Sequence, residues 1–485
     1  MSYFGKTCFL LVLLMLLFTS LKAQDDRLPD GNLAVGATFN TNLDGLGSSL
    51  PFWLHANKQG LYDQRSANSL FYTEFSKPLV TGDQLSIQTS GRIIGRAAEE
   101  STLGIHRLSA TANYGFLTLR VGKFVDPLGM NYHPLSSGSM QYSMNAEPVP
   151  KVVLQTDGFV DVPLSQGYVQ FSSYLGHGWF ENARYVKNSY IHQKYFYLKV
   201  NYKMLEGIGG IIHNVQWGGD HPTRGQQPSS FKDFWRVLWA KGAGENSNAP
   251  GGEISNVLGN SVAAYDFNLR VNLDQFRLTF YRLFYLEDKV STRFRSPWDG
   301  MWGGGIIRTA DHPVLKSFLY EHINTKRQDS FDFEPRGSAS YYNNSFYPSG
   351  WTYKNRVLGN PLLLTDGSNI RPVYNNIIIA HHLGARGFLN PNVEWTAFYT
   401  FSRNYGEKRD QIIEYKPAPR EETIYGEYRP MEELKKINHS LYFGSTFLVP
   451  QYENLELSAG IALDVGELYS PDRVGLTFSA KYNIY

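Results

Sequence analysis

The chain has 485 residues, a formal net charge of +2 and one cysteine, Cys8. The small net charge gives no indication of nucleic-acid binding. Because Cys8 lies in an apolar stretch at the N-terminus, the rest of the chain can form no disulfide, thiolate metal site or cysteine nucleophile. Charged residues make up 19% of the chain, below the roughly 25% usual for soluble domains. Aromatic residues reach 15% while the mean hydropathy is −0.33, which suits a barrel with half-apolar strands and equally a carbohydrate-binding protein.

The N-terminus has the pattern of a secretory signal peptide. Lys6 precedes the apolar run CFLLVLLMLLF, which is followed by TSLKAQ. This arrangement predicts a signal peptide over residues 1–23, cleaved after Ala23. The run is too short to predict a membrane-spanning helix, and no later segment is long and apolar enough to form one. We therefore expect residues 24–485 to form one domain without a membrane-spanning helix.

Segments in which polar and apolar residues alternate recur along most of the remaining chain. The clearest covers 262–273, where Phe267 and Leu269 belong to one face and Asp266 and Arg270 to the other. Further candidate strands lie at 117–121, 169–175, 196–202, 276–280, 393–401, 455–463 and 474–484. A period of two predicts β-strands with two unlike faces. The longer strands match the length of about ten residues that crosses a bilayer at a tilt, whereas strands of soluble sandwiches usually have about five or six.

Charged residues fall on the polar faces of these strands, among them Arg120, Lys199, Arg270, Arg277 and Glu394. A Lys or Arg on the lipid face near the bilayer midplane would cost about 2–4 kcal/mol, so we expect these side chains in the lumen of a barrel. The barrel must be closed because unpaired backbone groups at a sheet edge are not tolerated in hydrocarbon. A soluble β-sandwich with solvated charged faces is the alternative.

Short and long connections alternate between the candidate strands. The short set is 113–115, 162–166, 203–207, 274–275 and 450–454, and the long set is 125–150, 176–193, 218–261, the stretch after Asp288 and 403–438. In outer-membrane barrels the short turns face the periplasm and the long loops face outward. The last strand would then run toward the periplasm and end at the aromatic Tyr485, which is out of phase with the apolar face ending at Ile484.

Two segments show helical spacing of their apolar residues. In 229–242 the apolar residues recur every three or four positions, and Ser229 or Ser230 is a suitable N-cap. In 311–322 Asp311 stands shortly before a proline and a similar stripe follows. We expect both to be loop helices that pack over the barrel mouth.

Aromatic loop residues are candidates for sugar binding, which needs flat apolar surfaces beside amide, hydroxyl and charged groups. The candidates are Trp298 and Trp302 beside Arg295 and Asp299, Tyr341, Tyr342 and Trp351 beside Asn343, Asn344 and Arg356, and Trp235 and Trp239 in the predicted helix. The alternative is that these rings pack the loops onto the barrel or form the aromatic girdle at the membrane interface.

The sequence gives little support to metal or enzyme chemistry. His381 and His382 are adjacent in a predicted strand, so their rings should point to opposite faces, and no nearby acid completes a ligand set. No nucleophile-elbow pattern G-x-S-x-G is present. We expect no metal, no other cofactor and no catalytic residue.

Several stretches resemble the Wzi-type capsule-assembly proteins of the outer membrane. They are PFWLHANKQG (51–60), GHGWFENARYVKNSYIHQKYFYLKV (176–200), FLYEHINTKRQ (318–328) and YYNNSFYPSGWTYKNRVLGNPLLL (341–364). The resemblance implies a single antiparallel transmembrane barrel of about eighteen strands, an extracellular mouth covered by loops, and short helices in loops or at the periplasmic end. It also implies a lectin that holds nascent capsular polysaccharide and has no enzymatic activity. The family's ligand residues cannot be matched one by one, so no binding residue is carried over.

Three functions follow as hypotheses. The first is an outer-membrane lectin, monomeric among lipid and lipopolysaccharide, that anchors capsular or surface polysaccharide. The second is a channel for sugars or other small solutes, since a lumen lined by polar and charged residues suits that role too. The third, an outer-membrane enzyme, is motivated only by the serine and histidine content.

Overall fold

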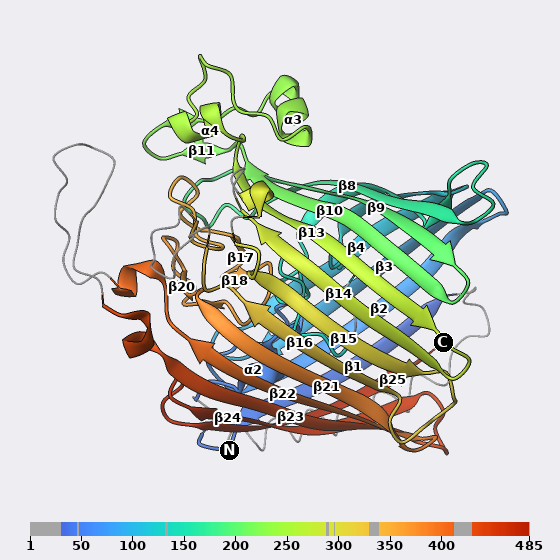
Figure 1. The fold of residues 1–485 in the computed structure, drawn as a ribbon. Coiled ribbons are helices and arrows are strands. Elements are labelled where there is room, and N and C mark those ends of the chain that lie inside the picture. Colours follow the sequence, from blue (N-terminus) through green and yellow to red (C-terminus); the bar gives the residue numbers. More distant parts are fainter. Residues whose placement is uncertain are drawn as a thin grey trace.

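The chain forms a closed antiparallel barrel of eighteen strands (Figure 1). A computed structural model describes residues 31–45, 48–130, 134–287, 291–294, 296–328, 339–411 and 429–484. The predicted signal peptide and Tyr485 lie outside the described residues. The first strand, β1 (Asn32–Asn42), pairs with β2 (Asn68–Thr81) on one side and with the last strand, β25 (Arg473–Asn483), on the other, which closes the sheet. The predicted fold class is confirmed.

Every barrel strand pairs with its neighbours in the chain. The others are β3 (Leu85–Ala97), β4 (Thr102–Tyr114), β5 (Leu117–Lys123), β6 (Pro150–Thr156), β8 (Val169–Trp179), β9 (Tyr190–Tyr202), β10 (Leu205–Trp217), β13 (Asn260–Asn272), β14 (Phe276–Leu286), β15 (Gly300–Arg308), β16 (Ser317–Asn324), β21 (Ile378–Asn390), β22 (Val393–Asn404), β23 (Lys436–Leu448) and β24 (Leu455–Gly466). The two-residue β7 (Val160–Asp161) pairs with β8, as β6 does, and continues β6. This meander leaves no unpaired edge for lipid to meet.

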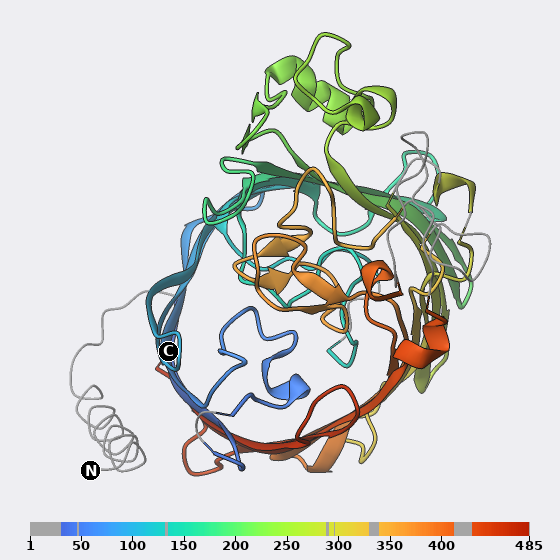
Figure 2. The ribbon, with the colours of Figure 1, turned by 90° about the vertical axis from the view of Figure 1, so that its left-hand side faces the viewer.

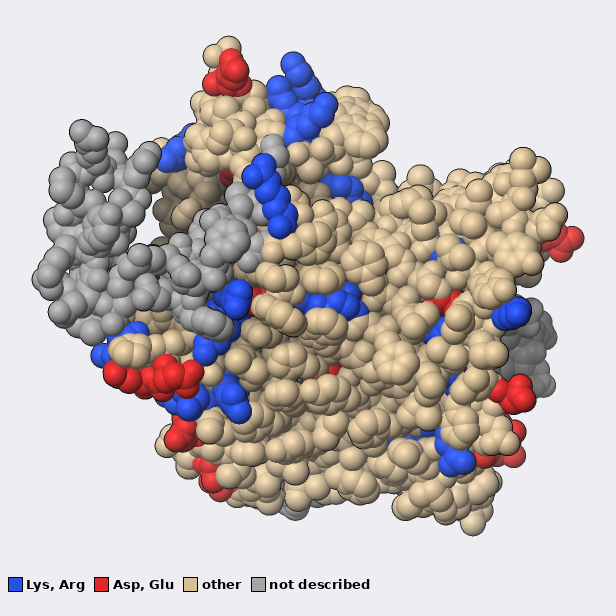
Figure 3. All heavy atoms as spheres, in the orientation of Figure 1, with Lys and Arg blue, Asp and Glu red and all other residues tan. Residues whose placement is uncertain are grey.

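The strands have the two faces that their sequences predict. On β13, Asp266 and Asn268 point into the lumen and are buried, whereas Phe267 and Leu269 point outward and are exposed. Arg270 also faces inward, and its guanidinium lies 3.8 Å from the carboxylate of Glu206 on β10. The outer wall is largely free of charged residues, which gather toward the two ends of the barrel (Figure 3).

Short turns and long loops lie at opposite ends, as predicted. Two or three residues connect β9 with β10, β13 with β14 and β21 with β22 at one end, whereas 218–259, 325–377 and 405–435 connect strands at the other. Two connections at the long-loop end are also short, the four residues 98–101 and the six residues 467–472. We refer to the two ends as the short-turn end and the long-loop end.

All α-helices of the described chain lie in long-loop connections: α2 (Phe52–His55), α3 (Phe231–Leu238) and α4 (Gly251–Ser255). The helix predicted over 229–242 is confirmed as α3. Ser230 is its N-cap: the Ser230 hydroxyl accepts a hydrogen bond from the Asp233 N–H, and the Asp233 carboxylate accepts one from the Ser230 N–H. The helical elements expected at the periplasmic end have no counterpart among the described residues. None of the described helices has the length and apolar character needed to cross a membrane.

The helix predicted over 311–322 is wrong. Residues 317–324 form strand β16, which pairs with β15 on one side and β21 on the other. Its apolar residues satisfy an alternating pattern as well as a helical one, because Leu319 and Ile323 are buried inside while Phe318 and Tyr320 are exposed outside. Two neighbouring strands that satisfy every backbone group outweigh a weak helical preference.

Three connections fold into the lumen, where Figure 2 shows them within the ring of strands. We call the described parts of 43–67, 124–149 and 339–377 the plug. The plug carries four short strands in two hairpins, β17 (Thr352–Tyr353) with β18 (Arg356–Val357) and β19 (Leu364–Thr365) with β20 (Val373–Asn375). Its apolar residues join inward-facing strand residues in one buried cluster, which includes Trp53, Leu135, Met140, Tyr341, Trp351, Tyr281, Ile323 and Ala380. The lumen therefore holds a hydrophobic core.

Candidate functional site

Carboxylates on the barrel wall fix the plug through its backbone. Asp464 on β24 accepts a hydrogen bond of 2.8 Å from the Phe52 N–H, and Asp266 on β13 accepts one of 3.1 Å from the Met130 N–H. Glu321 on β16 accepts one of 2.8 Å from the Ser137 N–H. Hydrogen bonds to buried charged groups are among the strongest in proteins, so these contacts define where two of the three plug segments lie.

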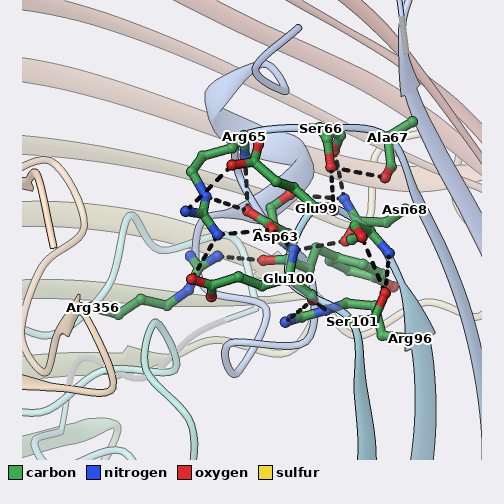
Figure 4. Close-up of polar contacts among 12 residues, drawn as sticks. Asp63, Arg65, Ser66, Ala67, Asn68, Arg96, Glu99, Glu100, Ser101 and Arg356 are labelled. Carbon is green, nitrogen blue, oxygen red and sulfur yellow. Dashed lines mark hydrogen bonds and ion pairs between the residues drawn. The ribbon is translucent and has the colours of Figure 1, made fainter. Parts of the chain in front are cut away.

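A polar network also fixes the first plug segment, 43–67, at the long-loop end (Figure 4). The Asp63 carboxylate accepts hydrogen bonds from the Arg65 guanidinium and from the Glu100 N–H, at 3.1 and 2.8 Å. Arg96 donates to the carbonyls of Gly60 and Leu61, at 3.2 and 3.1 Å. The plug segment is thereby joined to the loop between β3 and β4.

This network continues into the plug hairpin, because Arg356 of β18 donates to the Tyr62 carbonyl. Arg65 also lies 2.8 Å from the carboxylate of Glu100, which neutralises part of its charge. The result is a connected surface on the plug that carries Arg65 and Arg356.

A pocket of about 330 Å³ opens beside this network, where the plug meets the β24–β25 connection. We call it the mouth pocket. Its lining is Ser49, Phe52, His55, Gln64, Arg65, Asn145, Arg356, Val357, Pro361, Leu363, Leu364, Thr365, Tyr374, Leu468, Tyr469, Ser470 and Arg473. The set combines aromatic rings with amide, hydroxyl and guanidinium groups, which is the combination that a sugar with acidic substituents requires.

Two arginines of the mouth pocket, Arg356 and Arg473, carry positive charge that no direct ion pair with a described residue neutralises. Neither Arg356 nor Arg473 has an acidic side chain within 4.0 Å in the part of the chain that the structure describes. The guanidinium of Arg473 lies 4.0 Å from the ring centre of Tyr469. Burial, and then the charges of Arg356 and Arg473, lower the pKa of His55 well below its ordinary value, so this imidazole is neutral. The pocket is therefore complementary to an anion.

The three predicted plug aromatics are completely buried. Tyr341, Tyr342 and Trp351 have 0% exposure. The Trp351 indole N–H donates to the Gln141 carbonyl at 2.7 Å, and the Tyr341 hydroxyl donates to the Asp299 carboxylate at 2.8 Å. A ring without an exposed face offers no surface to a sugar, so these three pack the plug in this conformation.

The other four predicted rings are exposed but lie apart from the mouth pocket. Trp302 points outward from β15, with the Arg282 guanidinium 4.5 Å from its ring centre. Trp298 is exposed in the loop before β15, and Trp235 and Trp239 are exposed on and after α3. Their role in glycan binding stays a prediction.

Most of the mouth pocket is not predictable from the sequence. Arg356 was noted only as a neighbour of the aromatic cluster, and Arg473 and Tyr374 were not singled out at all. Arg473 lies 117 residues after Arg356, and no spacing in the sequence indicates that the two meet.

The adjacent histidines behave as predicted. His382 points inward, where it hydrogen-bonds the Thr400 hydroxyl and the Leu135 carbonyl, both at 2.8 Å. His381 points outward and lies 2.8 Å from the Tyr320 hydroxyl. Among the described residues, no group of three or more His, Cys, Asp or Glu side chains is arranged to hold a metal ion.

A closed eighteen-strand barrel with an apolar outer wall, a plug in the lumen and an arginine-rich pocket at the long-loop end defines a plugged outer-membrane barrel. The family model "Capsule assembly protein Wzi" matches residues 56–363, more than half of the chain. The chain therefore belongs to the Wzi family of capsule assembly proteins and lies in the outer membrane.

A solved structure shows the same fold. The chain is similar to Wzi of Escherichia coli, an outer membrane protein involved in group 1 capsule assembly and a carbohydrate-binding β-barrel, with 13% identity and a TM-score of 0.54 over 92% of this chain and 83% of that one. It also matches OccK5 (OpdH) of Pseudomonas aeruginosa, with 9% identity and a TM-score of 0.46 over 94% of this chain and 98% of that one. No curated protein matches the chain. At such identities the likeness concerns the fold alone.

Proposed function

We propose that this barrel is a lectin that holds an acidic surface polysaccharide at the outer face of the outer membrane. It acts by binding, without catalysis. Membership of the capsule-assembly family and the likeness to a carbohydrate-binding barrel support the general role. The observation that carries the choice of ligand is the pair of arginines in the mouth pocket, Arg356 and Arg473, which have no acidic partner among the described side chains.

The geometry of the mouth pocket suits the carboxylate of a sugar acid. Guanidinium groups bind carboxylates through two parallel hydrogen bonds, which fixes orientation as well as adding energy. Tyr374, at 43% exposure, offers a flat apolar surface for the C–H face of a ring. Asn145 and Thr365 supply amide and hydroxyl groups for neutral substituents.

The channel hypothesis has less support. A conducting porin needs a continuous water-filled path, whereas the plug segments fill this lumen with a buried apolar cluster. A cavity of about 470 Å³ near the short-turn end is lined by polar and charged groups such as Glu74, Arg107 and Arg120. This cavity accommodates water below the plug but does not by itself form a pore.

The proposal is tested by binding of an acidic oligosaccharide to the purified barrel in neutral detergent. We expect Arg356→Gln and Arg473→Gln each to weaken binding by about tenfold or more, because one charge-assisted hydrogen bond contributes roughly 1.5–3 kcal/mol. Reducing the sugar carboxyl to an alcohol should weaken binding to the unmodified protein similarly. Cells carrying the double variant should release polysaccharide into the medium while synthesising the same total amount.

Arg403→Gln is the matched control, because Arg403 lies on the outer wall of β22 and is exposed. It changes the net charge equally and should bind as the unmodified protein does. Equal binding by both pocket variants and by the control would refute the mouth pocket as the glycan site.

A further inference from the structure

Helix α3 lies on the outside of the barrel. Figures 1 and 2 both show the segment 218–259 outside the ring of strands, over the long-loop ends of β8, β9 and β10. Phe234 of α3 packs against His177 and His192, with ring centres 5.7 and 5.3 Å apart. Val237 joins Val215 and Trp217 of β10 in a buried cluster. The inner side of the helix is therefore fixed to the barrel wall.

The outer wall under α3 carries polar side chains beside the apolar Val215 and Trp217. Four side chains of β8, β9 and β10 point outward here: His177, His192, Lys194 and His213. The residues directly before and after each of them in its strand face the lumen. The Lys194 ammonium donates to the Val237 carbonyl at 3.0 Å. Lys194 is the fifth residue of β9, so the α3 segment covers the outer wall for roughly 13 Å along this strand from its long-loop end.

The outer side of α3 is aromatic and has no protein partner among the described residues. Phe231, Trp235 and Trp239 are 75%, 45% and 66% exposed. They continue the outward apolar surface of the strands below, where Phe196 and Leu198 of β9 are 47% and 46% exposed. Single exposed rings are common, but three on one helix beside a lipid-facing wall form a patch that indicates an interface.

Basic residues flank this aromatic side. Lys232 lies on the next face of the helix, and Lys241 follows its C-terminal end; both are exposed. Arg236 is paired with Asp233 at 2.5 Å. Basic side chains are visible on the segment that carries α3 at the top of Figure 3. An amphipathic helix with aromatic rings on one face and lysines beside it is typical of a helix that lies in a membrane interface.

We propose that α3 is an interfacial anchor that binds the phosphorylated glycolipid of the outer leaflet, lipopolysaccharide. The rings of Phe231, Trp235 and Trp239 insert among the acyl chains, and Lys232 and Lys241 bind the phosphates. This assigns Trp235 and Trp239 to lipid rather than to capsular glycan. The lipid contact is independent of the mouth pocket, so either proposal can fail without the other.

The first test is the depth of a spin label at position 235 in the folded, full-length protein. Because Cys8 is the only cysteine, a Cys8→Ser chain with Trp235→Cys takes one label. The measured quantity is the ratio of the label's collision rate with oxygen to its collision rate with a water-soluble nickel reagent. In vesicles containing lipopolysaccharide we expect this ratio to be several-fold higher at position 235 than at the exposed loop position 245, labelled in Glu245→Cys. Phe196→Cys is the matched lipid-facing control, since its side chain is as exposed as that of Trp235. Solvent-like accessibility at position 235, equal to that at 245, would overturn the proposal.

The second test concerns the lysines and does not depend on labelling. Titrated with lipopolysaccharide in neutral detergent, Lys232→Gln/Lys241→Gln should bind roughly tenfold more weakly than the unmodified barrel. The matched control is Lys77→Gln/Lys203→Gln, which removes two exposed lysines at the short-turn end and should bind normally. Dephosphorylated lipopolysaccharide should abolish the difference between the variants. Equal affinities of the two double variants for intact lipopolysaccharide would overturn the proposal.

Discussion

Glu321 shows how one buried carboxylate can determine the position of a plug segment. Its side chain is completely buried and accepts hydrogen bonds from the Ser136 hydroxyl at 2.6 Å, the Ser137 N–H at 2.8 Å and the Tyr281 hydroxyl at 2.6 Å. The Ser137 hydroxyl makes a fourth contact at 2.5 Å. Each of these groups donates to the carboxylate, so the ionised form is satisfied without a salt bridge.

We expect Glu321→Gln to loosen the plug without opening the barrel. The amide keeps the shape of the side chain, but its NH2 group then faces donors, above all the Ser137 N–H. An unsatisfied buried donor costs roughly 1–3 kcal/mol, which should appear as faster hydrogen exchange in residues 134–141.

Glu394→Gln is the control for this prediction. Glu394 lies on β22, its side chain is 39% exposed, and its contact with Arg386 is 3.9 Å long. Exposed pairs of this kind contribute less than about 1 kcal/mol, so exchange in the plug should not change. If both variants exchange at the same rate as the unmodified protein, Glu321 does not hold the plug.

At the scale of elements, local signals decided which predictions succeeded. Strand β13 and helix α3 were predictable because the first has a strict period of two and the second has an N-cap at Ser230. Strand β16 was mistaken for a helix because an eight-residue segment can satisfy both periods, and only pairing with its neighbours decides. The outward Lys194 could not be anticipated, because its cover comes from a helix some forty residues later.

The loop that carries α4 should respond to pH through Glu253. Burial raises the pKa of this carboxyl to about 7, against an opposing hydrogen bond of 2.8 Å from the Gly259 N–H. A carboxyl with a raised pKa binds its proton more tightly in the folded loop. The protonated Glu253 carboxyl therefore stabilises the folded loop fully below its ordinary pKa of 4.5, and this stabilisation is lost as the pH rises through about 7.

We expect residues 241–259 to become less protected from hydrogen exchange between about pH 5 and about pH 8. After correction for the intrinsic exchange rate, the free energy of opening should fall by at most about 3 kcal/mol. Glu253→Gln keeps an acceptor for the Gly259 N–H but cannot ionise, so its protection should be independent of pH. Glu245→Gln, an exposed change in the same loop, should retain the dependence of the unmodified protein. Persistence of the dependence in Glu253→Gln would show that another group causes it.

At the scale of the whole molecule, the barrel was predictable and the plug was not. Alternating faces and alternating loop lengths are repeated in most hairpins, so the closed sheet follows from many consistent signals. The plug rests on single contacts between distant segments, such as the hydrogen bond from Trp351 to Gln141. This explains why the buried rings of the plug were candidates for sugar binding. The sequence alone does not distinguish an aromatic residue that packs inside a lumen from one that faces solvent.

The filled lumen makes a prediction about conductance. In planar bilayers the unmodified barrel should show no steady current, because the plug segments occupy the lumen and the wall carboxylates hold them in place. The variant Asp266→Asn/Glu321→Gln should show brief openings, since it weakens the contacts to Met130 and Ser137 while the eighteen strands keep their pairing. Arg403→Gln on the outer wall should remain silent. A steady ohmic current through the unmodified protein, comparable with that of an open porin of similar strand number, would mean that the plug leaves a continuous water path and would restore the channel hypothesis.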